Sequence, residues 1–196
     1  APALTPIPLP EDLIFFNGLG GFSPDGSEYV IAIDDKKKTP APWVNVIANP
    51  KFGTVISESG SSYTWTENAH ELRLTPWCND SVSDTTGEAF YIRDYESGHF
   101  WSTSLLPSGG KTPYITRHGF GYSVFEHIED GVYTEMTVYI DIETAIKFTV
   151  IKIRNQSGRP RKLSATGYVE WVLGDNRMKT AMHIQTEIEP ESGTLF

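Results

Sequence analysis

The sequence predicts an all-β protein built as an antiparallel sandwich. Along residues 132–140 apolar side chains alternate with Tyr, Glu and Thr, which is typical of a strand with one buried face. Short apolar runs recur along the chain between Gly, Pro, Asn and Asp, and none of them follows the helical period of 3.6 residues. Regularly spaced strands without intervening helices must bury their apolar faces against a second sheet.

The N-terminal segment differs in composition from the rest. Residues 1–13 contain prolines at positions 2, 6, 8 and 10, which exclude a helix and predict an extended linker or tether. The three glycines of residues 17–22 do not have the spacing of a dinucleotide-binding loop, and a turn follows them. We therefore predict a linker over 1–13 and one β-sandwich domain over 14–196.

The strands can be placed from their patterns and flanking turns. The predicted strands are 28–33, 44–48, 54–57, 62–66, 89–94, 114–118, 121–127, 132–140, 145–154 and 161–173. Residues 145–154 are apolar on both faces, which favours a central strand, and the turn-forming residues 155–160 predict a long hairpin with 161–173. The chain begins without Met and stops without a polar tail, so we expect an incomplete sandwich cut from a longer polypeptide.

Composition limits the classes of partner and compartment. The net charge of −9 argues against nucleic acid, because phosphate binding needs a clustered basic face. The single cysteine, Cys78, excludes an internal disulfide and favours a reducing, cytoplasmic compartment; we expect it to be a buried, inert thiol. No apolar run has the length of a membrane-spanning helix.

The stretch 42–80 has the composition of a carbohydrate-binding surface. It holds three of the five tryptophans, each beside Asn, Asp, Ser or Gly. Aromatic faces stack on sugar rings, and short polar groups hydrogen-bond their hydroxyls. The candidate sugar-binding residues here are Trp65, Trp77, Asn79 and Asp80. The alternative is that Trp43, Trp65 and Trp77 are packing residues, since tryptophan is strongly buried on average.

Other candidate chemistry is weaker. Asp80, Asp84 and Glu88 lie close in sequence, but glycosidase carboxylates come from different elements, so turn formation and solvation are the expected roles. The five histidines show no zinc-binding spacing, and no nucleophile elbow occurs, so neither a metal nor an organic cofactor is expected.

The run 117–122 places two glycines around Phe120, next to Arg and His. One interpretation is a loop whose polar side chains, Arg117, His118 and Tyr122, point outward to a ligand or a neighbouring subunit. The other is a structural corner with a hydrogen-bonded histidine.

Several motifs in order resemble the N-terminal region of glycoside hydrolase family 94, and the match covers nearly the whole chain from about residue 14. They are residues 16–22, 45–53, 57–60 with 63–65, 74–77 with 79–80, 117–119 with 121–122, 167–171 and 179–183. Residues 16–22 and 39–43 look more like the β-1,2-glucan synthases and oligoglucan phosphorylases than like cellobiose phosphorylase.

The resemblance implies a galactose mutarotase-like β-supersandwich, followed in the parent protein by an (α/α)6 catalytic barrel that holds the general acid and the phosphate site. It implies no catalytic residue in this chain, inorganic phosphate as co-substrate of a phosphorylase, a β-glucan oligosaccharide as substrate and a homodimer. A sandwich loop can approach the adjacent subunit's active site in this family, and Arg117, His118 and Tyr122 are the candidates. The alternatives are an independent carbohydrate-binding module and a purely structural or dimerisation domain, and the location expected is the cytoplasm or the cytoplasmic domain of an inner-membrane glucan synthase.

Overall fold

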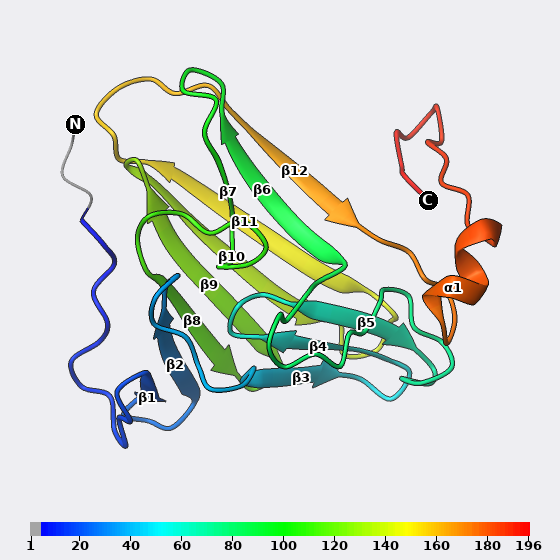
Figure 1. Ribbon diagram of the computed structural model, residues 1–196, viewed down its shortest axis with the longest axis horizontal. Coiled ribbons are helices and arrows are strands. Elements are labelled where there is room, and N and C mark those ends of the chain that lie inside the picture. Colours follow the sequence, from blue (N-terminus) through cyan, green and yellow to red (C-terminus); the bar gives the residue numbers. More distant parts are fainter. Residues whose placement is uncertain (1–4) are drawn as a thin grey trace.

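A computed structural model describes residues 5–196 and shows a nearly all-β architecture (Figure 1). The predicted fold class is confirmed. The strands are β1 (Gly20–Phe22), β2 (Glu28–Ile33), β3 (Val44–Ala48), β4 (Phe52–Ser57), β5 (Ser62–Thr66), β6 (Glu88–Asp94), β7 (Phe100–Ser102), β8 (Tyr114–Gly119), β9 (Tyr122–Glu129), β10 (Val132–Ile140), β11 (Lys147–Asn155) and β12 (Leu163–Val169). A single helical turn, α1 (Arg177–Thr180), and a 3-10 turn (Ala181–His183) follow.

The strands form three antiparallel sheets. The largest has the order β1-β2-β8-β9-β10-β11, and two three-stranded sheets have the orders β12-β6-β7 and β3-β4-β5. The main core joins Ile56 of β4 to Phe125 of β9 and Met136 of β10, so the β3-β4-β5 sheet packs on one face of the large sheet. Ile92 and Trp101 pack on Val132, which places the β12-β6-β7 sheet on that same face. The molecule is therefore a two-layer sandwich with one divided layer.

The centre of the large sheet follows the sequence prediction closely. Residues of β10 alternate between buried and half-buried positions over its whole length. Asp130 and Gly131 connect β9 to β10, both with positive φ, of 48° and 79°. This is the two-residue hairpin chemistry that matches the twist of the flanking strands.

The predicted hairpin between 145–154 and 161–173 is wrong. β11 pairs with β10, whereas β12 crosses to the other layer and pairs with β6. Within the turn between them, Asn155 Nδ2 donates a hydrogen bond to the carbonyl of Arg159 at 2.7 Å. The turn can therefore form whether or not the two strands that it connects pair with each other. Arg161 is buried against Asp94 at 2.7 Å and fixes the start of β12 on the β6 layer.

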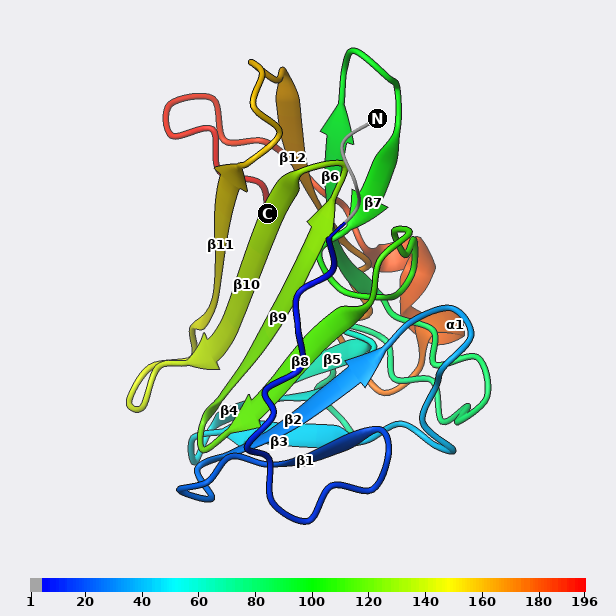
Figure 2. The same cartoon turned by 90° about the vertical axis from the view of Figure 1, so that its left-hand side faces the viewer.

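β11 is also not a central strand among the described residues. It ends the large sheet, and β12 ends its own sheet. Figure 2 shows these two strands as the outermost members of the two layers on the same side of the molecule. Both carry exposed apolar side chains, including Phe148, Val150, Ile153 and Tyr168. In the predicted linker, residues 5–13 contain no helix or strand; its first four residues lie outside the described part.

Candidate functional site

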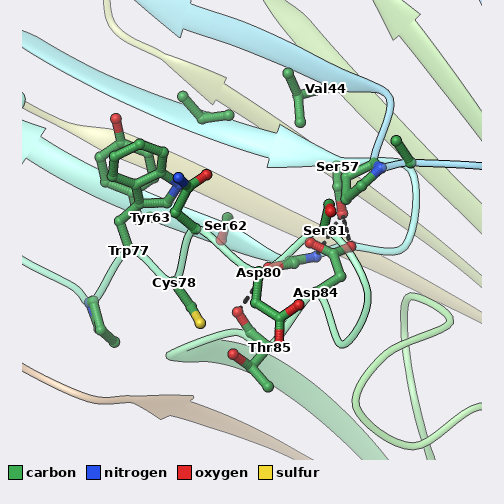
Figure 3. Close-up of a pocket in the computed structure, with 16 residues that line it drawn as sticks. Val44, Ser57, Ser62, Tyr63, Trp77, Cys78, Asp80, Ser81, Asp84 and Thr85 are labelled. Atoms are coloured by element: carbon green, nitrogen blue, oxygen red, sulfur yellow. Dashed lines mark hydrogen bonds between the residues drawn. The ribbon is translucent and has the colours of Figure 1, made fainter.

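A hollow on the surface lies between the outer side of the β3-β4-β5 sheet and the loop formed by residues 76–85 (Figure 3). Its volume is about 330 Å³. Ala41, Pro42 and Val44 close one side, and Val55 and Tyr63 reach it from β4 and β5. Of the predicted sugar-binding residues, the structure brings Trp77, Asn79 and Asp80 together here.

One wall of this hollow is aromatic. The rings of Tyr63 and Trp77 stack with centroids 5.5 Å apart and planes 26° apart, and Trp77 remains 48% exposed. The guanidinium carbon of Arg73 lies 5.3 Å from the centroid of the Trp77 ring, a cation–π distance. The pair is therefore held as a rigid wall by contacts that leave part of the indole open to solvent.

The other wall is polar and carries two carboxylates. Asp80 Oδ1 accepts hydrogen bonds from the backbone N–H groups of Val82 and Ser83, and its Oδ2 accepts one from the Ser83 hydroxyl. These bonds, led by the one from the Ser83 hydroxyl, lower the pKa of Asp80 below its ordinary value. Asp80 therefore organises the loop and is ionised at neutral pH.

Asp84 is the second carboxylate, and its backbone has a φ of 45°, a conformation that non-glycine residues seldom adopt. Ser57 donates to its Oδ2 at 2.7 Å (Figure 3), while its Oδ1 has no hydrogen-bond donor within residues 5–196. The turn thus holds a carboxylate oxygen with free acceptor capacity at the hollow. From the sequence, Asp84 was a candidate only as a member of the trio Asp80, Asp84 and Glu88.

Glu88, the third member of that trio, lies elsewhere. It is largely buried and pairs with Lys147 at 2.5 Å between the two layers. Burial by itself would raise the pKa of Glu88. The ammonium group of Lys147 and the hydroxyls of Thr75 and Thr64 outweigh that effect, so the pKa lies below its ordinary value. The three carboxylates therefore do not form one acid/base site.

Arg117, His118 and Tyr122 belong to a separate region, the β8–β9 hairpin, and not to a loop. Arg117 Nε lies 3.0 Å from Glu126, and its Nη1 lies 3.4 Å from Glu28. The Tyr122 hydroxyl donates to Glu28 at 2.6 Å. The expectation of an outward-pointing loop is therefore wrong for Arg117 and Tyr122, because carboxylates of neighbouring strands hold both side chains.

His118 lies deeper. Ser123 Oγ is 2.8 Å from its Nδ1 and the carbonyl of Trp43 is 3.1 Å from its Nε2. Burial lowers the pKa of His118 to about 4, so the ring is neutral at physiological pH. The exposed residue of this hairpin is instead Phe120, at its tip, with 87% of its surface open.

Two further predicted residues, Trp65 and Cys78, differ in their position relative to the hollow. Trp65 lies beside Tyr63, with ring centroids 5.4 Å apart, but does not line the hollow. Cys78 is exposed and lines the hollow, so the expectation of a buried thiol is wrong. The polar loop that carries Cys78 crosses the outside of the sheet, which leaves the thiol open to solvent.

One further cluster has metal-ligating groups. Side-chain ligand atoms of His99, Glu129 and Asp130 lie within 4.8 Å of one another. The ammonium group of Lys111 lies 3.7 Å from Glu129 and 3.5 Å from Asp130. A cation is therefore already supplied by the protein, and the cluster does not resemble a vacant metal site.

Comparison with known proteins decides the family. The model of the supersandwich domain of glycosyl hydrolase 94 matches residues 27–196. The chain belongs to glycoside hydrolase family 94. Its Arg117, His118 and Tyr122 and its aromatic hollow therefore lie on the supersandwich of a family 94 protein.

Curated relatives support this membership. The chain is 40% identical to cyclic β-(1,2)-glucan synthase NdvB of Rhizobium meliloti (strain 1021) over 185 residues, which are 94% of the chain and 6% of that protein. It is 35% identical to N,N'-diacetylchitobiose phosphorylase of Vibrio furnissii over 81% of the chain and 20% of the relative. Solabiose phosphorylase of Paenibacillus borealis is 27% identical over 80% of the chain and 20% of its own length. The chain thus spans at most about a fifth of the length of these family 94 relatives.

Within residues 5–196 no helix has both the length and the apolar character needed to cross a bilayer.

Proposed function

We propose that this chain is the N-terminal accessory β-sandwich of an enzyme that phosphorolyses or transfers β-linked glucans with inversion. The catalytic residues would lie in an (α/α)6 domain outside this chain. Support comes from the relatives, whose names describe a β-(1,2)-glucan synthase and glycoside phosphorylases, and which are several times longer than the matched region.

The observation that carries the accessory role is the distribution of apolar side chains. Of the five tryptophans, all within the described residues, Trp77 alone is exposed, and Trp101 is fully buried. In contrast, apolar side chains are open along β11, β12 and the C-terminal segment, where Met178 and Met182 are 89% and 83% exposed. Apolar exposure along two open sheet edges is typical of a surface that another part of the protein covers. We therefore assign this side to docking within the parent polypeptide.

In the proposed phosphorolysis, phosphate attacks the anomeric carbon from the face opposite the leaving group while an acid protonates the glycosidic oxygen. Configuration inverts, so a β-linked glucan yields an α-glucosyl phosphate. Inorganic phosphate would be the only co-substrate required. The sandwich would brace the barrel and contribute to a homodimer, with the β8–β9 hairpin next to the adjacent active site.

The test is an assay of the parent polypeptide with phosphate and either β-1,2- or β-1,4-glucans, following α-glucose 1-phosphate by NMR. The isolated chain should be inactive, and the parent should form the α-anomer or transfer glucosyl units. Formation of the β-anomer, or turnover by the isolated chain alone, would contradict the proposal.

The alternative of a carbohydrate-binding module is favoured by one observation, the aromatic hollow. The cytoplasmic location that we propose rests on the lone cysteine.

A further inference from the structure

The hollow beside Trp77 has a chemistry that selects its ligand. One wall is the Tyr63–Trp77 stack, and the other presents the carboxylates of Asp80 and Asp84. Within residues 5–196 no donor reaches Asp84 Oδ1, so this oxygen is free to accept a hydrogen bond. No lysine, arginine or histidine lines it within the described residues. Carboxylates without a cationic partner repel phosphate and other anions, so the inorganic co-substrate is excluded from this hollow.

A cation is also a poor fit. The groups of three His, Cys, Asp or Glu residues with converging ligand atoms in residues 5–196 do not include Asp80 or Asp84. What remains is a neutral ligand with an apolar face and several hydroxyl donors. Such a ligand can pack against the aromatic wall while its hydroxyls donate to carboxylate oxygens, which is the chemistry of a pyranose.

The size and construction of the hollow agree with this. Its volume of about 330 Å³ is at the lower end of small-molecule sites and is sufficient for a single sugar ring with part of its neighbour. Asp84 is held there with a φ of 45° by Ser57, which shows that the surrounding turn fixes the carboxylate in place rather than leaving it on a mobile loop.

We infer that this hollow is a sugar-binding site for one glucosyl unit of a β-linked glucan. The glucosyl ring packs against Tyr63 and Trp77, and its hydroxyls donate to Asp80 and Asp84. The site anchors the glucan chain to the sandwich. The identity of the sugar rests on the function proposed above, whereas the preference for a neutral polyol rests on the hollow alone.

Cys78 supplies a reporter inside the site, because it is the only cysteine of the chain and lines the hollow. The experiment measures the rate at which neutral 4,4′-dithiodipyridine modifies Cys78, with and without β-1,2-linked glucotriose. A Kd of about 1 mM is expected for one sugar ring on an exposed site. At ten times that concentration the rate should fall about tenfold, in a saturable manner, and inorganic phosphate at equal concentration should have no effect.

Two variants connect the effect to the hollow. Trp77→Ala removes the aromatic wall and should abolish protection of Cys78. Thr85→Trp fills the hollow and should abolish binding measured by saturation-transfer NMR, while Thr144→Trp, at an exposed turn far along the chain, should bind normally. Near-UV circular dichroism of each variant establishes that it is folded. An unchanged Cys78 rate with glucotriose, or equal protection by glycerol, would overturn the inference.

The Cys78 experiment and the assay of the parent enzyme can give different results, so each proposal can fail without the other. If the parent enzyme forms α-glucose 1-phosphate from glucans but Cys78 is not protected, the sugar site fails and the enzymatic role stands. If Cys78 is protected but the parent turns over neither β-1,2- nor β-1,4-glucans, the enzymatic role fails and the binding site stands.

Discussion

The ammonium group of Lys147 lies 2.5 Å from Oε2 of Glu88, joining the first residue of β11 to the first residue of β6. Thr75 and Thr64 donate to the other oxygen of Glu88 at 2.6 and 2.7 Å, and Lys147 also donates to Thr54 and Thr64. The pair therefore links all three sheets through a buried polar network. Such a network stabilises one arrangement of the layers, because every member is hydrogen-bonded.

Replacing Lys147 by Met should destabilise the chain by about 3 kcal/mol, because it leaves a buried carboxylate without its cation. The free energy of unfolding in urea, followed by tryptophan fluorescence, measures this. The double variant Lys147→Met/Glu88→Leu should recover part of the loss, since neither charge is then buried alone. If the double variant loses more unfolding free energy than the two single variants lose together, Lys147 and Glu88 do not stabilise the fold as a pair.

The stability of the chain should fall between pH 6.5 and pH 4 because of His118. Burial lowers the pKa of this histidine to about 4, whereas the unfolded chain protonates it near 6.5. As pH falls through this window the unfolded state gains a proton that the folded state cannot accept, so about 3 kcal/mol is lost. Urea midpoints at half-unit pH steps measure the slope. His118→Gln should flatten it, and an unchanged slope would assign the effect to another group.

A second loss of stability should follow at lower pH, from Glu129. His127, the backbone N–H of Lys111 and His99 all hydrogen-bond its carboxylate and, against the cost of burial, lower its pKa from 4.5 to about 2. A depressed carboxylate pKa stabilises the folded state above the unfolded value and loses that contribution as pH falls from 4.5 to 2. Glu129→Gln should remove this acid transition in circular dichroism while leaving the His118 transition in place. Persistence of the lower transition would exclude Glu129 as its source.

A methyl group added at Gly53 should destabilise β4. Its Cβ would lie 2.1 Å from Cζ2 of Trp65 on the paired strand, so the indole must move out of its packed position. We expect Gly53→Ala to cost about 2 kcal/mol in urea unfolding, as overpacking commonly does. The matched double variant Gly53→Ala/Trp65→Ala should be more stable than additivity predicts. Strict additivity would mean that the two residues do not interact.

A lysine on the exposed edge strands β11 and β12 should reduce self-association of the chain without changing its unfolding free energy. Ile153→Lys and Tyr168→Lys place a charge on exposed positions of β11 and β12, where lysine opposes strand-to-strand association. The isolated chain should then show less self-association by light scattering, with its unfolding free energy within about 0.5 kcal/mol of the original. In the parent enzyme the same changes should reduce stability. Gln156→Lys, at an exposed position of the turn after β11, serves as the charge control. An equal effect of that variant would show that the change does not depend on the sheet edges.

The sequence predicted most strands because their signals are local. The alternation along β10 depends only on neighbouring residues, and this strand was placed correctly. The pairing of β11 and β12 depends on contacts between distant residues, such as Arg161 with Asp94, which no local pattern contains. The two candidate regions were similarly visible in composition, but the burial of His118 and the exposure of Cys78 depend on which layer covers each segment. Tyr63, which completes the aromatic wall, was recognised as part of the aromatic stretch, but only the strand geometry shows that it stacks on Trp77.

The crossing of β12 to the other layer also has a consequence for the order of folding. β8, β9, β10 and β11 are consecutive hairpins, so their contacts close short loops and can form early. The attachment of β12 to β6, by contrast, joins residues such as Arg161 and Asp94 that lie 67 positions apart, and it must wait until a long loop has closed. The meander should therefore nucleate folding, and the β6–β12 ladder should be the last part to form and the first to open.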